Sequence, residues 1–240
     1  MDQRKERVYG GMSAADRREQ RRTSLIEAGL QLFGTEGYPN ISVKRICDEA
    51  GLTQRYFYES FTDREALLDA VYRHCVEILR AASMTAAVDY LSTRLSATVR
   101  KNDAVPAELI PGLARNALGG FIKTLAEDRR RARVILIEVV GVSPALEKLR
   151  ISAIHDWAGL ILSFTSTGSG LNNRSRLSII GFVGAFTQLL VDWQMALADP
   201  ISDETGPDLF TIDAIHEVCT EMLIAIWERI LVDDDAPAVP

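Results

Sequence analysis

Apolar residues recur at three- and four-residue intervals along most of the chain, which is the spacing of amphipathic helices. No segment alternates apolar and polar residues for long enough to indicate a strand. The pattern therefore predicts an all-α protein. Its first helix is capped by the run from Ser13 to Asp16, carries Leu25, Leu30 and Phe33 on one side, and ends near Gly34.

Two short helices follow the first one, separated by a glycine. Ser42 is a good N-cap, and apolar residues at helical spacing predict a helix over 42–50. Gly51 ends that helix, and Thr53 can cap a second one over 53–60, with Phe57 on its inward side. A box opened by Thr62 is expected to cap the next, longer helix. Two short helices joined by a glycine-bearing turn form a helix-turn-helix, whose second helix can enter the major groove of DNA.

The outward side of that second helix carries hydrogen-bonding groups. Gln54, Arg55 and Tyr58 lie at positions i, i+1 and i+4, so they share a face. Glutamine suits adenine and arginine suits guanine, each through two hydrogen bonds. The hydroxyls of Tyr56 and Tyr58 can reach phosphates, and their rings can touch thymine methyl groups.

Phosphate binding also favours helix N-termini and hydroxyl groups, which Ser42 and Thr53 supply. Lys44 lies in the first turn of its helix, where its charge opposes the helix dipole, and that placement makes more sense beside phosphates. Arg64 has the same position in the next helix. The predicted DNA-binding residues are Ser42, Lys44, Thr53, Gln54, Arg55, Tyr56, Tyr58 and Arg64.

The stretch "LIEAGLQLFGTEGYPNISVKRICDEAGLTQRYFYESFTDREALLDAV", within residues 17–76, resembles the N-terminal domain of TetR/AcrR-family transcriptional regulators. The resemblance implies DNA binding through the residues named above and a divergent C-terminal domain for ligand binding and dimerisation. Arg55 and Tyr56 are larger than the family's common residues, and Ser60 stands where a histidine is frequent. These departures concern the operator sequence and leave the docking mode unchanged.

The expected organisation has four parts. A flexible basic arm (1–15) precedes the helix-turn-helix domain (16–62), a helical ligand-binding and dimerisation domain (63–232) and a disordered tail (233–240). The net charge of −6 is uneven, because residues 1–75 carry 12 Lys or Arg and 12 Asp or Glu, so the whole deficit lies in the remainder. This asymmetry permits a DNA-binding end on an acidic body.

The segment from Leu177 to Trp193 is apolar on nearly all sides, and the last helix, 211–231, is similarly rich. A surface helix needs one apolar stripe to face its own core. A second apolar face on the same helix favours packing against a partner subunit under two-fold symmetry. The family resemblance implies the same homodimer, and a two-fold dimer should bind a roughly palindromic operator. The predicted interface residues are Ile179, Phe182, Val183, Phe186, Leu190, Met222, Ile226 and Ile230.

Ligand binding is a further implication of the resemblance. Residues suited to a pocket occur between 105 and 200, and an aromatic pocket favours an apolar or aromatic small molecule. The candidate ligand-binding residues are Phe121, His155, Trp157, Phe164, Phe186, Gln188 and Trp193.

Other classes of protein find less support. The three widely spaced cysteines read as buried thiols of a reducing compartment, and no signal peptide precedes the first helix, so we expect a cytoplasmic protein. The apolar segment Leu177–Val191 looks too short and too polar to span a bilayer. The histidines and cysteines lack metal-ligand spacing, and no nucleophile has a credible base. We therefore expect no enzyme, metal, cofactor or membrane partner.

The leading hypothesis is a sequence-specific repressor that a small molecule releases from its operator. An activator remains an alternative, as does an all-helical protein-interaction module that uses the same helix-turn-helix. An enzyme in the C-terminal bundle is a third, which would need convergent titratable groups that the sequence does not display.

Overall fold

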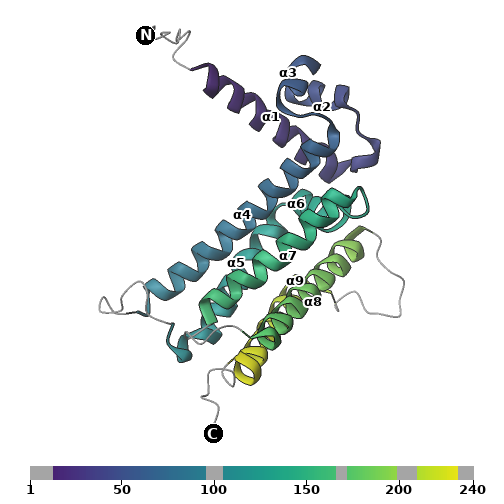
Figure 1. Cartoon of the computed structure of the whole chain (residues 1–240). Helices are drawn as coiled ribbons and strands as arrows, with labels where there is room; N and C mark the ends of the chain where they lie inside the picture. Colours follow the sequence, from purple (N-terminus) through teal and green to yellow (C-terminus); the bar gives the residue numbers. More distant parts are fainter. Residues whose placement is uncertain (1–12, 96–104, 166–171, 199–209, 232–240) are drawn as a thin grey trace. The chain divides into compact units, whose positions relative to one another are not determined.

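A computed structural model describes residues 13–95, 105–165, 172–198 and 210–231 (Figure 1). These residues are helical or lie in turns, with no strand among them, which confirms the all-α prediction. The chain divides into two compact units: Met1–Cys75 with Arg129–Val139, and Val76–Asp128 with Val140–Pro240. Most of the predicted arm and all of the predicted tail lie outside the described residues, and the predicted domain boundary at residue 63 stays a prediction.

The first unit begins with α1 (Ala14–Thr35), followed by the short η1 (Tyr38–Asn40). A capping box starts α1 as expected: Asp16 N–H donates to Ser13 Oγ at 3.0 Å, and Ser13 N–H donates to Asp16 Oδ2 at 3.1 Å. The remaining elements of the unit are α2 (Val43–Ala50), α3 (Gln54–Ser60), the first part of α4 (Arg64–Ser92), α6 (Arg129–Arg133) and the π-helical turn η3 (Val134–Glu138).

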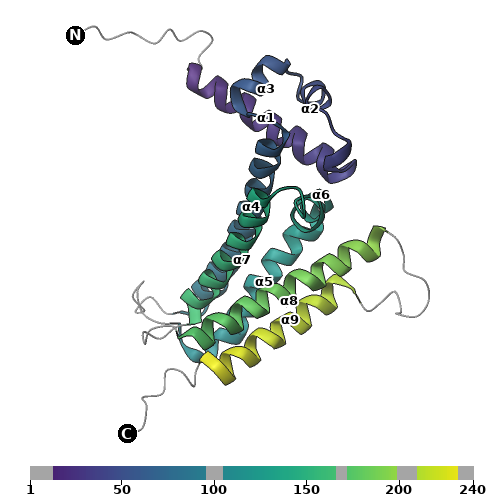
Figure 2. The same cartoon turned by 45° about the vertical axis from the view of Figure 1, so that its right-hand side comes forward.

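Helix α1 contacts both α2 and α3, which also contact each other (Figure 2). The core of this unit is made of large apolar side chains that are fully or almost fully buried. Each contributes about 1.5–3 kcal/mol to folding through its removal from water. They are Leu25, Leu32, Phe33, Ile46, Phe57, Leu67 and Leu68. This core fixes the orientation of α3, because Phe57 lies on its inner side.

The start of α4 differs from the expected capping box by one residue. Asp63, and not Thr62, accepts the backbone N–H of Ala66, at 2.8 Å to Oδ1. A carboxylate is a strong cap at a helix N-terminus because it also meets the positive end of the helix dipole. The prediction that Thr62 caps α4 is therefore wrong.

A segment some hundred residues further along the chain completes the first unit. Arg130 donates to Gln31 Oε1 at 2.6 Å, and Arg133 donates to the carbonyl of Thr35 at 2.7 Å. The carboxylate of Glu138 accepts the N–H of Tyr38 at 2.7 Å and also pairs with Arg133. These contacts attach α6 and η3 to the C-terminal end of α1 and to η1.

The second unit is a helical bundle of α5 (Ile110–Glu127), α7 (Pro144–Thr165), α8 (Asn173–Ala198), α9 (Ile212–Ile226) and the later part of α4. Helix α5 packs against α9, and α8 packs against both α7 and α9 (Figure 2). As expected, the last helix follows Thr211, which caps it and accepts the N–H of Ala214. A π-helical turn, Trp227–Leu231, ends it.

Candidate nucleic-acid interface

The turn between α2 and α3 is set by one glycine. Gly51 has φ 65° and ψ 31°, the left-handed conformation that favours glycine. Its N–H donates to the carbonyl of Asp48, and Leu52 N–H donates to the carbonyl of Cys47 at 2.9 Å. A Cβ at residue 51 would meet nothing within 4 Å, so the requirement for glycine is conformational and not steric.

The outer side of α3 presents three predicted residues to solvent. Gln54 and Arg55 are exposed, with the Arg55 side chain 84% accessible, and Tyr58 is 58% exposed. Tyr56 is half-buried, and the guanidinium of Arg21 lies 4.5 Å from the centre of its ring. Gln54, Arg55 and Tyr58 are thus available to contact base edges and phosphates. The ring of Tyr56 is partly covered by Arg21 of α1.

The predicted phosphate contacts at the helix N-termini are also at the surface. Ser42 caps α2 and accepts the N–H of Arg45 at 3.2 Å. Thr53 occupies the N-cap position of α3, but its hydroxyl makes no capping bond and remains available. Lys44 pairs with Asp48 at 2.8 Å, and this hydrogen bond raises the pKa of the lysine. Its side chain is 74% exposed, so the pair is solvated and easily exchanged for a phosphate.

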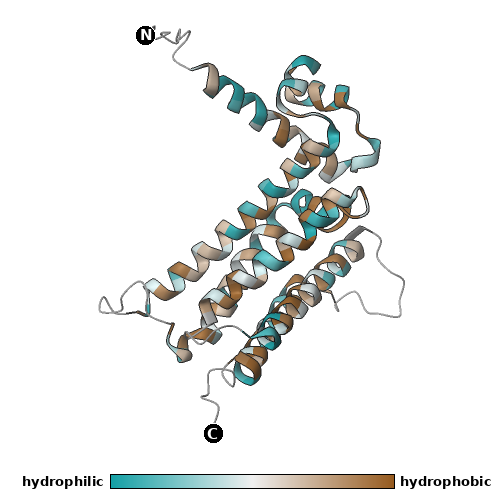
Figure 3. Cartoon of the chain, in the orientation of Figure 1, coloured by the Kyte–Doolittle hydropathy of each residue, from teal (hydrophilic) through white to brown (hydrophobic). Residues whose placement is uncertain are grey.

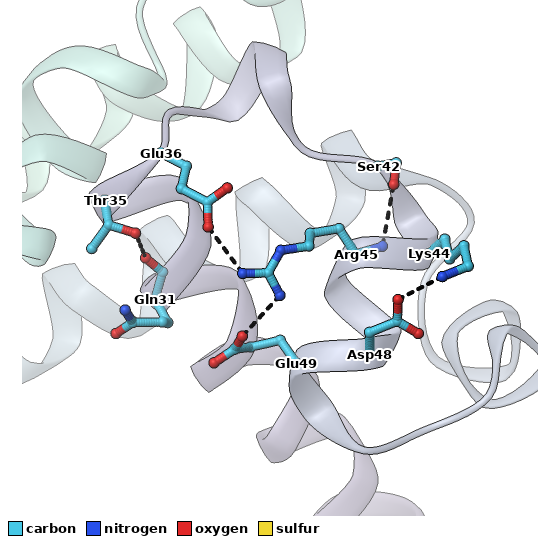
Figure 4. A network of polar contacts seen from close by, with 8 residues as sticks. All are labelled: Gln31, Thr35, Glu36, Ser42, Lys44, Arg45, Asp48 and Glu49. Carbon is cyan, nitrogen blue, oxygen red and sulfur yellow. Dashed lines mark hydrogen bonds and ion pairs between the residues drawn. The ribbon is translucent and has the colours of Figure 1, made fainter.

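Arg45 has a different role from its neighbour Lys44. Its guanidinium bridges Glu36, at 3.1 Å, and Glu49, also at 3.1 Å (Figure 4). These two hydrogen bonds raise the pKa of Arg45. The bridge ties α2 to the end of α1, and so helps to hold the helix-turn-helix on its scaffold.

Arg64 is turned toward the protein. Its Nη1 donates to the backbone carbonyls of Tyr38 and Ile41, and its guanidinium lies 5.0 Å from the centre of the Tyr38 ring. These contacts use the charge to hold the segment between α1 and α2. They favour a structural role over the predicted phosphate contact.

Basic side chains of α1 border α3, and the sequence reasoning did not single them out. Arg18 donates to the backbone carbonyl of Glu59 at 3.1 Å, Arg21 covers Tyr56, and Arg22 lies over the ring of Phe61 at 4.5 Å. The signal was present as the run "RREQRR" at 17–22, whose arginines fall on one side of a helix.

The opposite side of α1 is acidic. It lines an open hollow of about 780 Å³ whose walls include Asp16, Glu19, Glu27 and Glu49. Negatively charged side chains repel the phosphates of DNA, so this side of α1 is unsuited to DNA binding. On α1, the arginines Arg18 and Arg21 thus border α3, whereas Asp16, Glu19 and Glu27 line the hollow.

Three of the candidate ligand-binding residues come together in unit 2. The ring of Phe121 lies 5.2 Å from that of Trp157 and 5.3 Å from that of Phe186, measured between centres. Of the other candidates, Phe164 packs against the apolar cluster around Leu113, Trp193 is buried, and His155 and Gln188 are exposed.

The predicted dimer residues of α8 are buried within the protomer itself. Ile179, Phe182, Val183, Phe186 and Leu190 are at most 7% exposed. They have little surface left to give to a partner, so their assignment to an interface is corrected to the protomer core. The predicted residues of α9 and its final turn, Met222, Ile226 and Ile230, are half-buried.

Helix α8 is longer than the sequence pattern indicated. Over Asn173–Ala196 it is long and apolar enough to cross a membrane by length and composition, and it is the one such helix among the described residues. A third of the most apolar 18-residue stretch of this helix is buried inside the protein. A core helix passes the same test, and the buried side chains of α8 give it that role.

Residues 25–71 match the family model described as bacterial regulatory proteins, tetR family. This stretch spans the second half of α1, the whole helix-turn-helix and the start of α4. These residues thus carry the N-terminal domain of the tetR family. The matched region carries the outward residues Gln54, Arg55 and Tyr58, and its fold is that of the family's DNA-binding domain. No curated protein sequence matches the chain.

Solved structures share the fold of this chain over most of its length. The fatty acid degradation regulator FadR of Bacillus halodurans is 15% identical with a TM-score of 0.61, covering 85% of this chain and 94% of its own. A TetR-family regulator of Marinobacter aquaeolei is 17% identical with a TM-score of 0.56, covering 88% and 97%. FadR of Bacillus subtilis, solved with stearoyl-CoA, is 15% identical with a TM-score of 0.55, covering 85% and 96%.

Proposed function

We propose that the protein is a homodimeric repressor that places α3 in the major groove of a palindromic operator. The observation that carries this proposal is the exposed set of Gln54, Arg55 and Tyr58 on one face of a helix whose inner residue, Phe57, is fully buried. The buried core fixes the helix that carries these donors, and their amide and guanidinium groups suit adenine and guanine.

The dimer is assigned to the exposed side of α8. Leu177 is 68% and Met195 50% exposed, and between them Gly181, Gly184 and Gln188 are exposed at helical spacing. We call these five residues the α8 stripe. Hydrophobic residues, coloured brown, recur along both α8 and α9 (Figure 3). Two glycines in the centre permit the backbones of two such helices to approach closely, which would bury the exposed apolar ends.

Release by a small molecule is the second half of the proposal. The ring of Phe121 contacts both Trp157 and Phe186, so a ligand would enter by separating these rings. An apolar or aromatic molecule would replace the ring contacts at least cost. FadR of Bacillus subtilis, which has the same fold, was solved with stearoyl-CoA, and this supports a molecule with an apolar part as the effector class. The effect on DNA affinity is limited by the difference in ligand affinity between the two conformers.

Selection of bound duplexes from a random pool by the purified protein tests the DNA-binding proposal. We expect a palindromic site with half-sites about one helical turn apart. Substituting Arg55→Ala should cost roughly 1–3 kcal/mol at one base position and relax the preference there. The absence of salt-dependent duplex binding would instead support the protein-interaction alternative.

Arg73→Ala is a matched control for Arg55→Ala. Arg73 is also an exposed arginine that pairs through Nε with a carboxylate four residues away, Asp69, but it lies on α4. Its loss should leave the base preference at every position unchanged. If both substitutions alter the selected sites alike, Arg55 does not read a base.

A further inference from the structure

The recognition helix carries an acid where DNA phosphates are expected. Glu59 lies near the C-terminal end of α3, one turn after Arg55, and its side chain is 40% exposed. A carboxylate on a DNA-facing helix repels phosphate and lowers affinity for every sequence alike. Its presence on this helix therefore calls for a compensating role.

The two carboxylate oxygens of Glu59 face different partners. Oε1 accepts a hydrogen bond from Arg55 Nε at 3.0 Å, and Oε2 lies 4.0 Å from Arg21 Nη2. Arg18 holds the same residue by its backbone carbonyl, at 3.1 Å. Glu59 is thus fixed from α1 as well as from its own helix. A solvated pair between residues four apart has only its own helix to hold it.

The contact uses only the inner nitrogen of Arg55. A guanidinium has five N–H groups, one on Nε and two on each terminal nitrogen. The contacts of Arg55 among the described residues leave both terminal nitrogens open, and the side chain is 84% accessible. We call the two terminal nitrogens with their N–H groups the fork of Arg55. In a bidentate contact with guanine, two donors of an arginine bond to O6 and N7 of the base.

On the basis of the proposed function, we infer that Glu59 is a positioning residue that orients the fork of Arg55 for guanine. Fixing Nε leaves the arginine fewer conformations to lose on binding, while both terminal nitrogens stay free to donate. The negative charge of Glu59 lowers the affinity for every DNA sequence, while the orientation of Arg55 raises the preference for guanine.

The role predicts opposite effects on two quantities when Glu59→Ala is compared with wild type. Affinity for non-specific duplex should rise, by roughly two- to fivefold at low salt, because a charge near the phosphates is removed. Preference for guanine at the position identified by Arg55→Ala should fall at least about threefold, out of the roughly 5- to 150-fold that a bidentate pair supplies. A merely structural role would lower both quantities.

Two further variants separate charge from orientation. Glu59→Gln removes the charge but keeps an oxygen that can accept from Nε, so it should raise non-specific affinity while retaining more guanine preference than Glu59→Ala. The double variant Arg55→Ala with Glu59→Ala should show no more loss of preference than Arg55→Ala alone. Asp69→Ala, which breaks the matched pair on α4, should change neither quantity.

The outcomes distinguish the inference from the function beneath it. If the wild type binds no duplex, the proposed function fails, and the inference fails with it. If the wild type binds and Arg55→Ala alters one base position, but Glu59→Ala leaves that position unchanged, the inference alone is wrong. The inference is also overturned if Glu59→Ala changes a different position, since Glu59 then reads a cytosine amino group directly.

Discussion

The arginines of unit 1 differ in how much of each guanidinium the protein itself uses. Arg45 is bonded at both ends to carboxylates, and Arg64 donates to two backbone carbonyls. Arg55 uses only its inner nitrogen. A donor that already has an internal partner must break that contact before it can bind DNA, so the free fork of Arg55 is the best suited to read a base.

Arg64→Ala tests the structural role of that arginine. Loss of hydrogen bonds from a charged donor to the carbonyls of Tyr38 and Ile41 should lower the free energy of unfolding by about 1.5–3 kcal/mol. Urea denaturation gives this value, and the salt dependence of DNA binding is measured beside it. A flatter salt dependence at unchanged stability would restore the phosphate contact.

Sequence reasoning reached the outward residues of α3 because helical spacing alone decides which side chains share a face. Gln54, Arg55 and Tyr58 follow from that periodicity once Phe57 is assigned to the core. The inward turn of Arg64 could not be predicted in this way. The orientation of Arg64 depends on backbone carbonyls more than twenty residues earlier in the chain. Their position relative to Arg64 is set by the tertiary fold and not by helical spacing.

At the scale of elements, unit 1 depends on a close approach that no periodicity reveals. A Cβ added to Gly34 of α1 would lie 2.4 Å from the Cβ of Arg130 and 2.7 Å from its Cα. The glycine therefore permits α6 to lie directly against α1. The helical pattern predicted α1 and its end near this glycine. It could not predict that residues 129–139 pack against α1, because that contact depends on the tertiary fold.

Gly34→Ala and Gly51→Ala should both destabilise the protein, for different reasons. Alanine at residue 34 forces apart two backbones, and overpacking of this kind costs about 1–3 kcal/mol. Alanine at residue 51 meets no atom within 4 Å but must adopt φ 65°, at about 1–2 kcal/mol.

A third glycine serves as the control for both. Gly159 lies inside α7, with nothing within 4 Å of an added Cβ, and Gly159→Ala should stabilise by about 0.5–1 kcal/mol. Urea midpoints at constant slope measure all three variants. Equal stability of Gly34→Ala and wild type would mean that α6 is free to move away from α1.

For the whole molecule, the proposed homodimer depends on which face of α8 stays exposed in the second unit. The predicted interface residues of α8 proved to be its core side, because periodicity identifies apolar faces but does not tell which of two faces turns inward. The other face carries the α8 stripe, from Leu177 to Met195. A two-fold axis through this stripe would join two protomers, each with one recognition helix, as a palindromic operator requires.

Gly184→Glu tests this dimer without disturbing the protomer, because an added Cβ at residue 184 meets nothing within 4 Å of its own chain. A carboxylate in the middle of the α8 stripe would be buried without a partner on association, which costs several kcal/mol. We expect sedimentation to show a monomer with an unchanged helical circular-dichroism spectrum, and binding to a full palindrome to fall to that of a half-site. Gly159→Glu adds the same charge to a helical glycine of α7 and should stay dimeric. A dimer that survives Gly184→Glu would move the two-fold axis away from this face of α8.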